Sequence, residues 1–190
     1  MKPSRKQAED AVRILIEWAG DNPEREGLQD TPKRVVNAYE EFFRGYSEDP
    51  EAVLARTFDD VNGYDDMVIL RDICLESHCE HHMVPILGKL HLGYLPKKRV
   101  AGLSKLARIV DVYAKRLQTQ ETMTRQITDA IQQVLEPYGV GVVIEAKHQC
   151  MTTRGVHKPN VMTVTRCFSG IFKDDKSKQE EFMQLLGGRA

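Results

Sequence analysis

The chain has 190 residues, of which 41% are hydrophobic and 29% charged, and its formal net charge at pH 7 is -1. These values are typical of a soluble globular protein with one core, and they exclude a general electrostatic attraction to nucleic acid or to an anionic membrane. No apolar stretch approaches the length of a membrane-spanning helix, and residues 1–7 lack the apolar core of a signal peptide, so we expect a cytoplasmic protein.

Two amphipathic helices are predicted in the first 65 residues. Ser4 with Gln7 has the form of a capping box, and the apolar stripe that follows at helical spacing ends before Gly20. Thr31 before Pro32 is typical of a second helix, with threonine as the N-cap and proline at the first helical position. Residues 1–65 are therefore predicted to form an N-terminal helical region, and they carry no chemical motif of their own.

Residues 66–190 are predicted to form an α+β unit. Strand-like runs at 67–75 and 89–94 precede two amphipathic helices over 106–117 and 123–134, and further strands are expected at 140–151 and 161–168. Ser177 with Glu180 predicts the cap of a short terminal helix. This order predicts an antiparallel sheet with its helices on one face, within a single functional unit.

Metal-binding residue types are concentrated in two short stretches, His78-Cys79-Glu80-His81-His82 and His148-Gln149-Cys150. Cys79 and His82 stand three residues apart, so that one turn of backbone can direct a thiolate and an imidazole at the same ion. On a β-strand, His148 and Cys150 would share a face, because side chains repeat every second residue. The sequence therefore predicts a metal site with more donors than a metal needs.

The number of protein ligands decides the kind of site. Catalytic zinc takes three protein ligands and keeps one position open, and Cys79, His82 and Cys150 make such a set. His81 and His148 then remain as imidazoles that can move protons, which favours a water-activating site. Two alternatives stay open: a closed structural zinc site that uses four of the five residues, and five residues with no common role. The other cysteines, Cys74 and Cys167, are predicted to pack as small apolar side chains.

Polar residues at two predicted helix starts suggest binding of a ligand. Ser104, Lys105 and Arg108 follow Gly102, and a helix N-terminus with a hydroxyl and two cations suits phosphate, although a serine cap with solvated cations is the more usual interpretation. Glu121, after Gln120, is either a dipole-favoured acid or a carboxylate that accepts paired N–H groups from a purine or pterin edge. Arg154 is either an anion clamp or an ordinary surface arginine.

These motifs, in this order and spacing, resemble those of type I GTP cyclohydrolase, and the resemblance runs from about Ser4 to the terminal helix. It implies a tunnelling-fold (T-fold) subunit with an N-terminal helical extension, in a toroidal homodecamer with active sites at subunit boundaries. It also implies one zinc ion per subunit and the conversion of GTP and water to 7,8-dihydroneopterin triphosphate and formate, the entry step to folate or, in some organisms, tetrahydrobiopterin.

The resemblance also implies a role for each matching residue. The zinc ligands are Cys79, His82 and Cys150, and the proton-transferring imidazoles are His81 and His148. The substrate contacts are Glu121 for guanine with Gln120 beside it, and Ser104, Lys105, Arg108 and Arg154 for the triphosphate, with Arg34 as a further phosphate arginine from a neighbouring subunit. The chain departs from the family pattern at Asn37, Thr122, Arg166 and Cys167, none of which is a predicted zinc ligand.

Two other classes of function are consistent with parts of the pattern. One is a related T-fold enzyme that acts on another purine or pterin, against which the intact ligand set beside the Ser-Lys-Arg cluster argues. The other is a non-catalytic zinc module that binds nucleic acid or protein through a closed site. The near-neutral charge and the two spare histidines argue against that second class.

Overall fold

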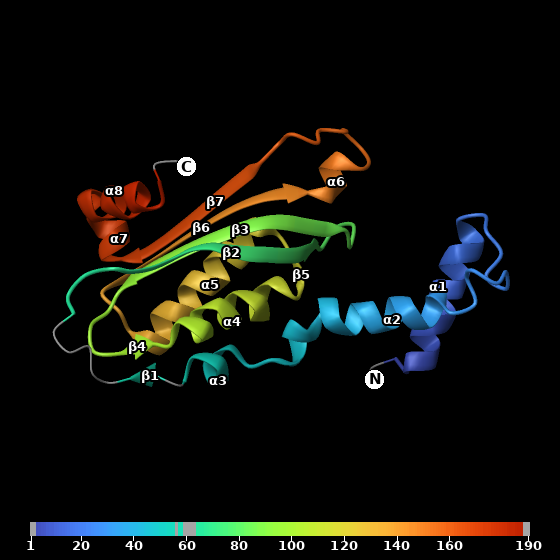
Figure 1. Cartoon of the computed structure of the whole chain (residues 1–190), viewed down its shortest axis with the longest axis horizontal. Helices are drawn as coiled ribbons and strands as arrows, with labels where there is room; N and C mark the ends of the chain where they lie inside the picture. The colour runs from blue at the N-terminus through green and yellow to red at the C-terminus, as the bar shows by residue number, and fades with distance from the viewer. Residues whose placement is uncertain (1–2, 56, 59–63, 188–190) are drawn as a thin grey trace. The chain divides into compact units, whose positions relative to one another are not determined.

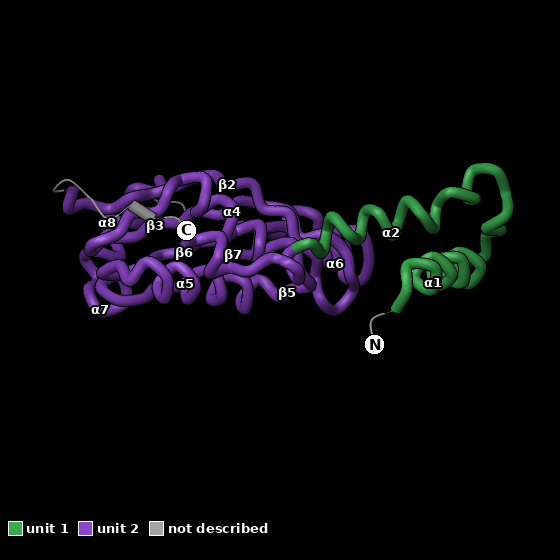
Figure 2. Tube along the Cα trace, turned by 90° about the horizontal axis from the view of Figure 1, so that it is seen from below, with its two compact units in different colours: residues 1–44 green, residues 45–190 purple. Residues whose placement is uncertain are grey.

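The computed structural model describes residues 3–55, 57–58 and 64–187, and the chain divides into two compact units, residues 1–44 and 45–190 (Figure 2). The first unit contains helices α1 (Arg5–Trp18) and α2 (Thr31–Phe42). The predicted capping box is confirmed, because the Ser4 hydroxyl accepts the Gln7 N–H and the Gln7 side chain accepts the Ser4 N–H. Thr31 is the first residue of α2, so that the N-cap is Asp30, one residue before the predicted position.

The second unit is built on a five-stranded sheet with the order β5-β2-β3-β6-β7. The strands are β2 (Val68–Cys79), β3 (Pro85–Leu95), β5 (Leu117–Gln118), β6 (Gly139–His148) and β7 (Thr163–Gly170). All neighbours are antiparallel except β5, which runs parallel to β2. The remaining elements are η1 (Arg44–Ser47), α3 (Pro50–Leu54), β1 (Thr57–Phe58), β4 (Val100–Ala101), α4 (Leu103–Ala114), α5 (Gln120–Leu135), α6 (Gln149–Thr152), α7 (Ile171–Asp174) and α8 (Lys176–Leu185).

Helices cover both faces of this sheet, whereas the sequence predicted helices on one face. The main core lies between the sheet and helices α4 and α5, and it includes Val142 of β6. Val143, which points to the opposite face, packs with Phe172 of α7 and Phe182 of α8 in a second, smaller cluster. The α+β class is confirmed, and α4 and α5 share one face of the sheet as predicted, but α7 and α8 cover part of the other face (Figure 1).

Three local predictions need correction. The predicted strand over residues 67–75 is the first part of one long strand, which continues to Cys79 after a register shift between Leu70 and Ile73. The terminal helix is capped by Asp175 rather than Ser177, because the Asp175 carboxylate accepts the Ser177 N–H at 2.8 Å. Cys74 is exposed on the sheet rather than packed in the core, whereas Cys167 is half-buried.

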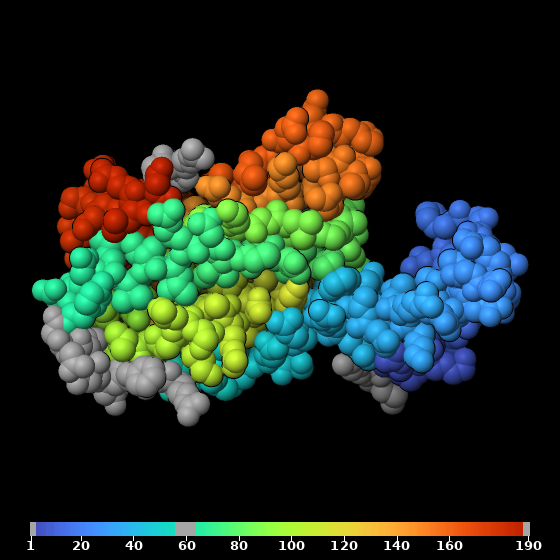
Figure 3. Space-filling view, in the orientation of Figure 1, coloured from blue at the N-terminus to red at the C-terminus, as the bar shows by residue number. Residues whose placement is uncertain are grey.

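The two ends of the sheet in the second unit carry different structures. The hairpin between β2 and β3, the short strand β5 and helix α6 lie at one end, where Cys79 pairs with Gln118 and Ile86 with His148. Helices α7 and α8 lie toward the other end, as the red and orange segments show in Figure 3. Within the described residues, no helix is both long and apolar enough to cross a membrane.

Candidate metal centre and surrounding residues

The turn between β2 and β3 brings Cys79 and His82 together. Cys79 is the last residue of β2, and its carbonyl accepts the Met83 N–H at 2.8 Å while its own N–H donates to the Val84 carbonyl at 2.9 Å. Met83 has a positive φ of 54°, which reverses the chain within this tight turn. As a result, the Cys79 Sγ lies 3.6 Å from the His82 Nδ1.

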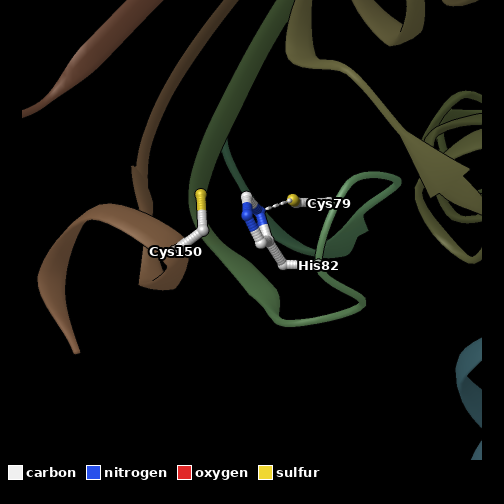
Figure 4. Close-up of side chains that lie close together, drawn as sticks. All are labelled: Cys79, His82 and Cys150. Atoms are coloured by element: carbon white, nitrogen blue, oxygen red, sulfur yellow. Dashed lines mark hydrogen bonds between the residues drawn. The ribbon is translucent and has the colours of Figure 1, made fainter. Parts of the chain in front are cut away.

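Cys150 completes the cluster from a different element than predicted. Strand β6 ends at His148, and Cys150 lies in the short helix α6, so His148 and Cys150 do not share a strand face. His148 pairs with Ile86, the second residue of the antiparallel strand β3, which begins at Pro85. Strand β6 therefore ends where its partner β3 begins. The helical turn still directs the Cys150 thiol at the hairpin, and the donor atoms of Cys79, His82 and Cys150 all lie within 4.8 Å of one another (Figure 4).

The donor set fits a zinc ion by its chemistry. Burial and the neighbouring Cys79 thiol both raise the pKa of the Cys150 thiol, since two thiolates side by side repel each other. A divalent cation between the thiols reverses this cost, because it favours both thiolates. Thiolate sulfur and imidazole nitrogen are ligands that zinc prefers, and among the residues described the cluster has three members, the number of an open site.

Arg154 lies beside this cluster. Its Nη1 donates to the His82 Nε2 at 3.0 Å, although the arginine follows α6 in an exposed segment. The sequence prediction that Arg154 belongs to the same site therefore agrees with its position, while its predicted contact with phosphate stays a prediction.

His148 and Gln120 meet at the start of α5. The His148 Nε2 lies 2.8 Å from the Gln120 Oε1, and burial lowers the pKa of the imidazole, an effect that the Glu121 carboxylate partly opposes. Glu121 is exposed one residue after the fully buried Gln120, in the first turn of the helix. The fold thus brings His148, Gln120 and Glu121 to the end of the sheet that also carries the cysteines.

His81 differs from His148 in its surroundings. Its side chain is 67% exposed, and its Nε2 lies 3.7 Å from a Glu80 carboxylate oxygen. Its ring centroid is 6.3 Å from that of His82. His81 therefore lies at the solvent-exposed rim of the cluster.

The predicted phosphate residues of α4 lie apart from the cluster in the same chain. Ser104 and Lys105 are in the first turn of α4, whose other end at Ala114 leads into β5 beside Cys79. Ser104 and Ala114 are ten positions apart in the helix, which corresponds to about 15 Å along its axis. Arg108 lies between these ends, and Arg34 belongs to the first unit, where it forms an ion pair with Asp30 at 3.2 Å.

Two residues near His148 were not predicted from the sequence to belong to the site. The side chains of Thr124 on α5 and Thr165 on β7 form hydrogen bonds with Gln120, at 2.6 Å to its carbonyl oxygen and 3.1 Å to its Nε2 respectively. A threonine in a strand or on a helix is common, so the only signal was the alternation of Thr163 and Thr165. Thr124 contacts the Gln120 carbonyl one turn along α5, whereas the contact of Thr165 with Gln120 depends on the pairing of β6 with β7, which no local pattern specifies.

Comparisons with known proteins identify the family of this chain. The family model described as GTP cyclohydrolase I matches residues 8–187. The protein named GTP cyclohydrolase 1 in Maricaulis maris is 62% identical to this chain, and the match covers 97% of this chain and 90% of that protein. The protein of the same name in Hyphomonas neptunium is 60% identical, and the match covers 98% of this chain and 90% of that protein. The protein of that name in Brucella suis is 57% identical, covering 97% and 87%. A match of this extent shows the family, and the chain belongs to the GTP cyclohydrolase I family.

Proposed function

We propose that this protein opens the guanine ring of GTP by zinc-dependent hydrolysis and releases 7,8-dihydroneopterin triphosphate and formate. The chain is an enzyme of a family that acts on GTP at the first step of pterin and folate biosynthesis. The observation that carries the mechanism is the cluster of Cys79, His82 and Cys150, with the imidazole of His148 held nearby. A cytoplasmic location remains a prediction.

The metal centre supplies the means to activate water. Zinc with three protein ligands acts as a Lewis acid that makes water reactive at neutral pH. Cys79, His82 and Cys150 are the residues that would hold it, because they are soft sulfur and nitrogen donors within 4.8 Å of one another.

His148 is proposed as the main proton donor to the ring nitrogen next to C8. Its imidazole is half-buried and hydrogen-bonded to Gln120, so its ring orientation is restrained. His81 is mostly exposed and has no comparable restraint among its described contacts, which supports a secondary role in proton transfer. General acid–base catalysis requires a positioned group, and His148 meets this requirement better.

Glu121 and Arg154 are proposed to bind the two ends of GTP. Glu121 lies close enough to His148 to affect its pKa, and a carboxylate there can accept paired N–H groups from guanine. Arg154 contacts His82, and its guanidinium can bind a phosphate oxygen pair. Glu121 would orient the base so that C8 faces the metal, and Arg154 would hold the triphosphate.

The distance along α4 supports active sites shared between subunits. Ser104 and Lys105 lie about 15 Å of helix away from the end of α4 next to Cys79. This separation favours a site in which one chain supplies the metal end and a second chain supplies the start of α4 for the same GTP. We infer a homo-oligomer, proposed as a toroidal homodecamer, in which Ser104, Lys105, Arg108 and Arg34 reach a neighbour's site.

The proposed function is tested by incubating the purified protein with GTP and measuring formate release together with pterin fluorescence after oxidation. We expect product that disappears when a chelator removes the metal and returns when zinc is added. A zinc-loaded, oligomeric protein that forms no product from GTP would refute the proposed reaction and leave the fold unaffected.

A further inference from the structure

The side chain of Gln120 is completely buried, and its orientation follows from its neighbours. Its Nε2 lies 3.1 Å from the Ile144 carbonyl, 3.0 Å from the Thr163 carbonyl and 3.1 Å from the Thr165 hydroxyl. Two of these neighbours are backbone carbonyls, which only accept hydrogen bonds. The amide nitrogen must therefore face them, and the opposite orientation, with Oε1 toward the two carbonyls, is excluded.

This orientation determines which nitrogen of His148 carries hydrogen. The Gln120 Oε1 lies 2.8 Å from the His148 Nε2, and an amide oxygen only accepts. His148 must then donate from Nε2. In the neutral imidazole the other nitrogen, Nδ1, keeps the lone pair.

Two threonines stabilise the amide in this orientation. The Thr165 hydroxyl accepts from Gln120 Nε2 and lies 2.7 Å from the Thr124 hydroxyl, which in turn donates to the Gln120 carbonyl at 2.6 Å. With Thr165 donating to Thr124, each hydroxyl donates once and accepts once, so the donors and acceptors form a closed ring. The two Nε2 hydrogens of Gln120 are shared among three acceptors, the Ile144 and Thr163 carbonyls and the Thr165 hydroxyl. The amide is still restrained, because turning it over would set its oxygen against the two carbonyl oxygens.

We propose that Gln120 is a positioning residue that holds His148 in the Nε2–H tautomer, so that Nδ1 is the atom that takes up the proton released when water is activated at the site and then donates it to the substrate. The proposal rests on the proposed function, since it assigns the reacting atom of the proposed proton donor. It also gives Gln120 a different task from the guanine contact that the sequence resemblance suggests. All polar atoms of this side chain lie within hydrogen-bond distance of protein groups.

The first test is the tautomer itself, measured without substrate. Long-range ¹H–¹⁵N correlation spectra of the full-length protein with ¹⁵N-labelled histidine distinguish the two neutral forms, and a His148→Ala spectrum identifies the signals. We expect His148 as the Nε2–H form. The Nδ1–H form, or a fast mixture of both forms, would overturn the proposal, and this readout does not depend on whether GTP is turned over.

The second test compares two variants of the same network. Gln120→Met keeps the length of the side chain and removes the acceptor for His148, whereas Thr165→Val removes one partner of Gln120 and leaves the His148 contact in place. We expect Gln120→Met to lose the single tautomer and to lower kcat by about tenfold or more with little change in KM for GTP. Thr165→Val is expected to keep the tautomer and to change kcat by less than about threefold, since that hydrogen bond does not reach His148.

The outcomes separate the proposal from its alternatives. Equal losses of kcat in both variants, with the His148 tautomer unchanged, would mean that the network only stabilises the fold. If Gln120→Met does not fold, the spectrum of the native protein decides the tautomer by itself. A native protein with the expected tautomer but no product from GTP would contradict the proposed function and not the positioning of His148 by Gln120.

Discussion

At the scale of single residues, the three members of the candidate metal centre differ in how the chain holds them. Cys79 and His82 are joined by one tight turn, whose backbone hydrogen bonds fix their spacing. Cys150 arrives from α6, more than sixty residues later in the sequence, and depends on the pairing of β3 with β6. Removal of Cys150 therefore leaves the turn intact and takes away one sulfur ligand.

We expect the change Cys150→Ala to reduce bound zinc from about one per chain to a small fraction of that value, because two protein ligands hold zinc poorly. Zinc content by mass spectrometry of the purified, dialysed protein measures this. Cys74→Ala is the matched control, since Cys74 is exposed on the sheet and has no part in the cluster. Equal zinc content in the two variants would exclude Cys150 as a ligand.

The change His148→Ala tests the separation of metal binding from proton transfer. Zinc content is expected to stay near normal, because the imidazole contacts Gln120 and is not one of the three clustered donors. Turnover of GTP is expected to fall by about 10²–10⁴-fold, the contribution of a positioned general acid or base. Loss of zinc from this variant would show that the proposed ligand set is incomplete.

At the scale of elements, the sequence predicted helices better than strand ends. The capping box at Ser4 and the helix start after Gly102 depend on residues close together in the chain, and both are present in the structure. The end of β6 at His148 depends on where its partner β3 begins, so the prediction of one strand through Cys150 was wrong. Alternation of residue types does not reveal that a partner strand has ended.

The irregular part of β2 was also hidden from the sequence. Asp72 has a positive φ of 58° at the register shift, and its N–H donates to the Nδ1 of the buried His91 on β3 at 3.1 Å. Burial lowers the pKa of His91 below its usual value of 6.5. Asp72 and Glu145 oppose this effect, while Arg71 and Lys89 add to it.

This lowered pKa predicts a pH-dependent stability of the sheet. Protonation of Nδ1 would break the bond from Asp72, so the stabilising contribution of neutral His91 is fully present above pH 6.5 and is lost as the pH falls through the lower folded pKa. Thermal melts between about pH 8 and pH 5 should show a steeper fall for the native protein than for His91→Gln, because glutamine does not titrate. Parallel curves for the two proteins would contradict this role of His91.

At the scale of the whole molecule, the α+β class and the membership of the GTP cyclohydrolase I family, both inferred from the sequence, are confirmed. The predicted division into residues 1–65 and 66–190 stays a prediction, although the compact units divide between residues 44 and 45. The position of Ser104 and Lys105 at the far end of α4 from β5 leads to a prediction about assembly.

We expect two defective variants to restore activity when they form mixed oligomers. Lys105→Ala with Arg108→Ala damages the start of α4, and His148→Ala damages the metal end of the sheet. If each site combines these parts from different chains, random mixing by co-expression leaves about a quarter of the sites intact, since each part is undamaged in half of the chains. Activity of the mixture equal to the mean of the two parent variants would mean that each chain builds its own site.

Residue identity and spacing along short pieces of chain were enough to predict the family, the three candidate donor residues and most of the helices. The three-dimensional structure was needed to show that Cys150 joins the candidate metal centre from a helix, that Gln120 contacts His148, and that Ser104 and Lys105 lie away from both cysteines of that cluster. These relations depend on strand register and on the packing of α4 and α5 against the sheet. Such contacts join residues far apart in the chain, and no local pattern specifies them.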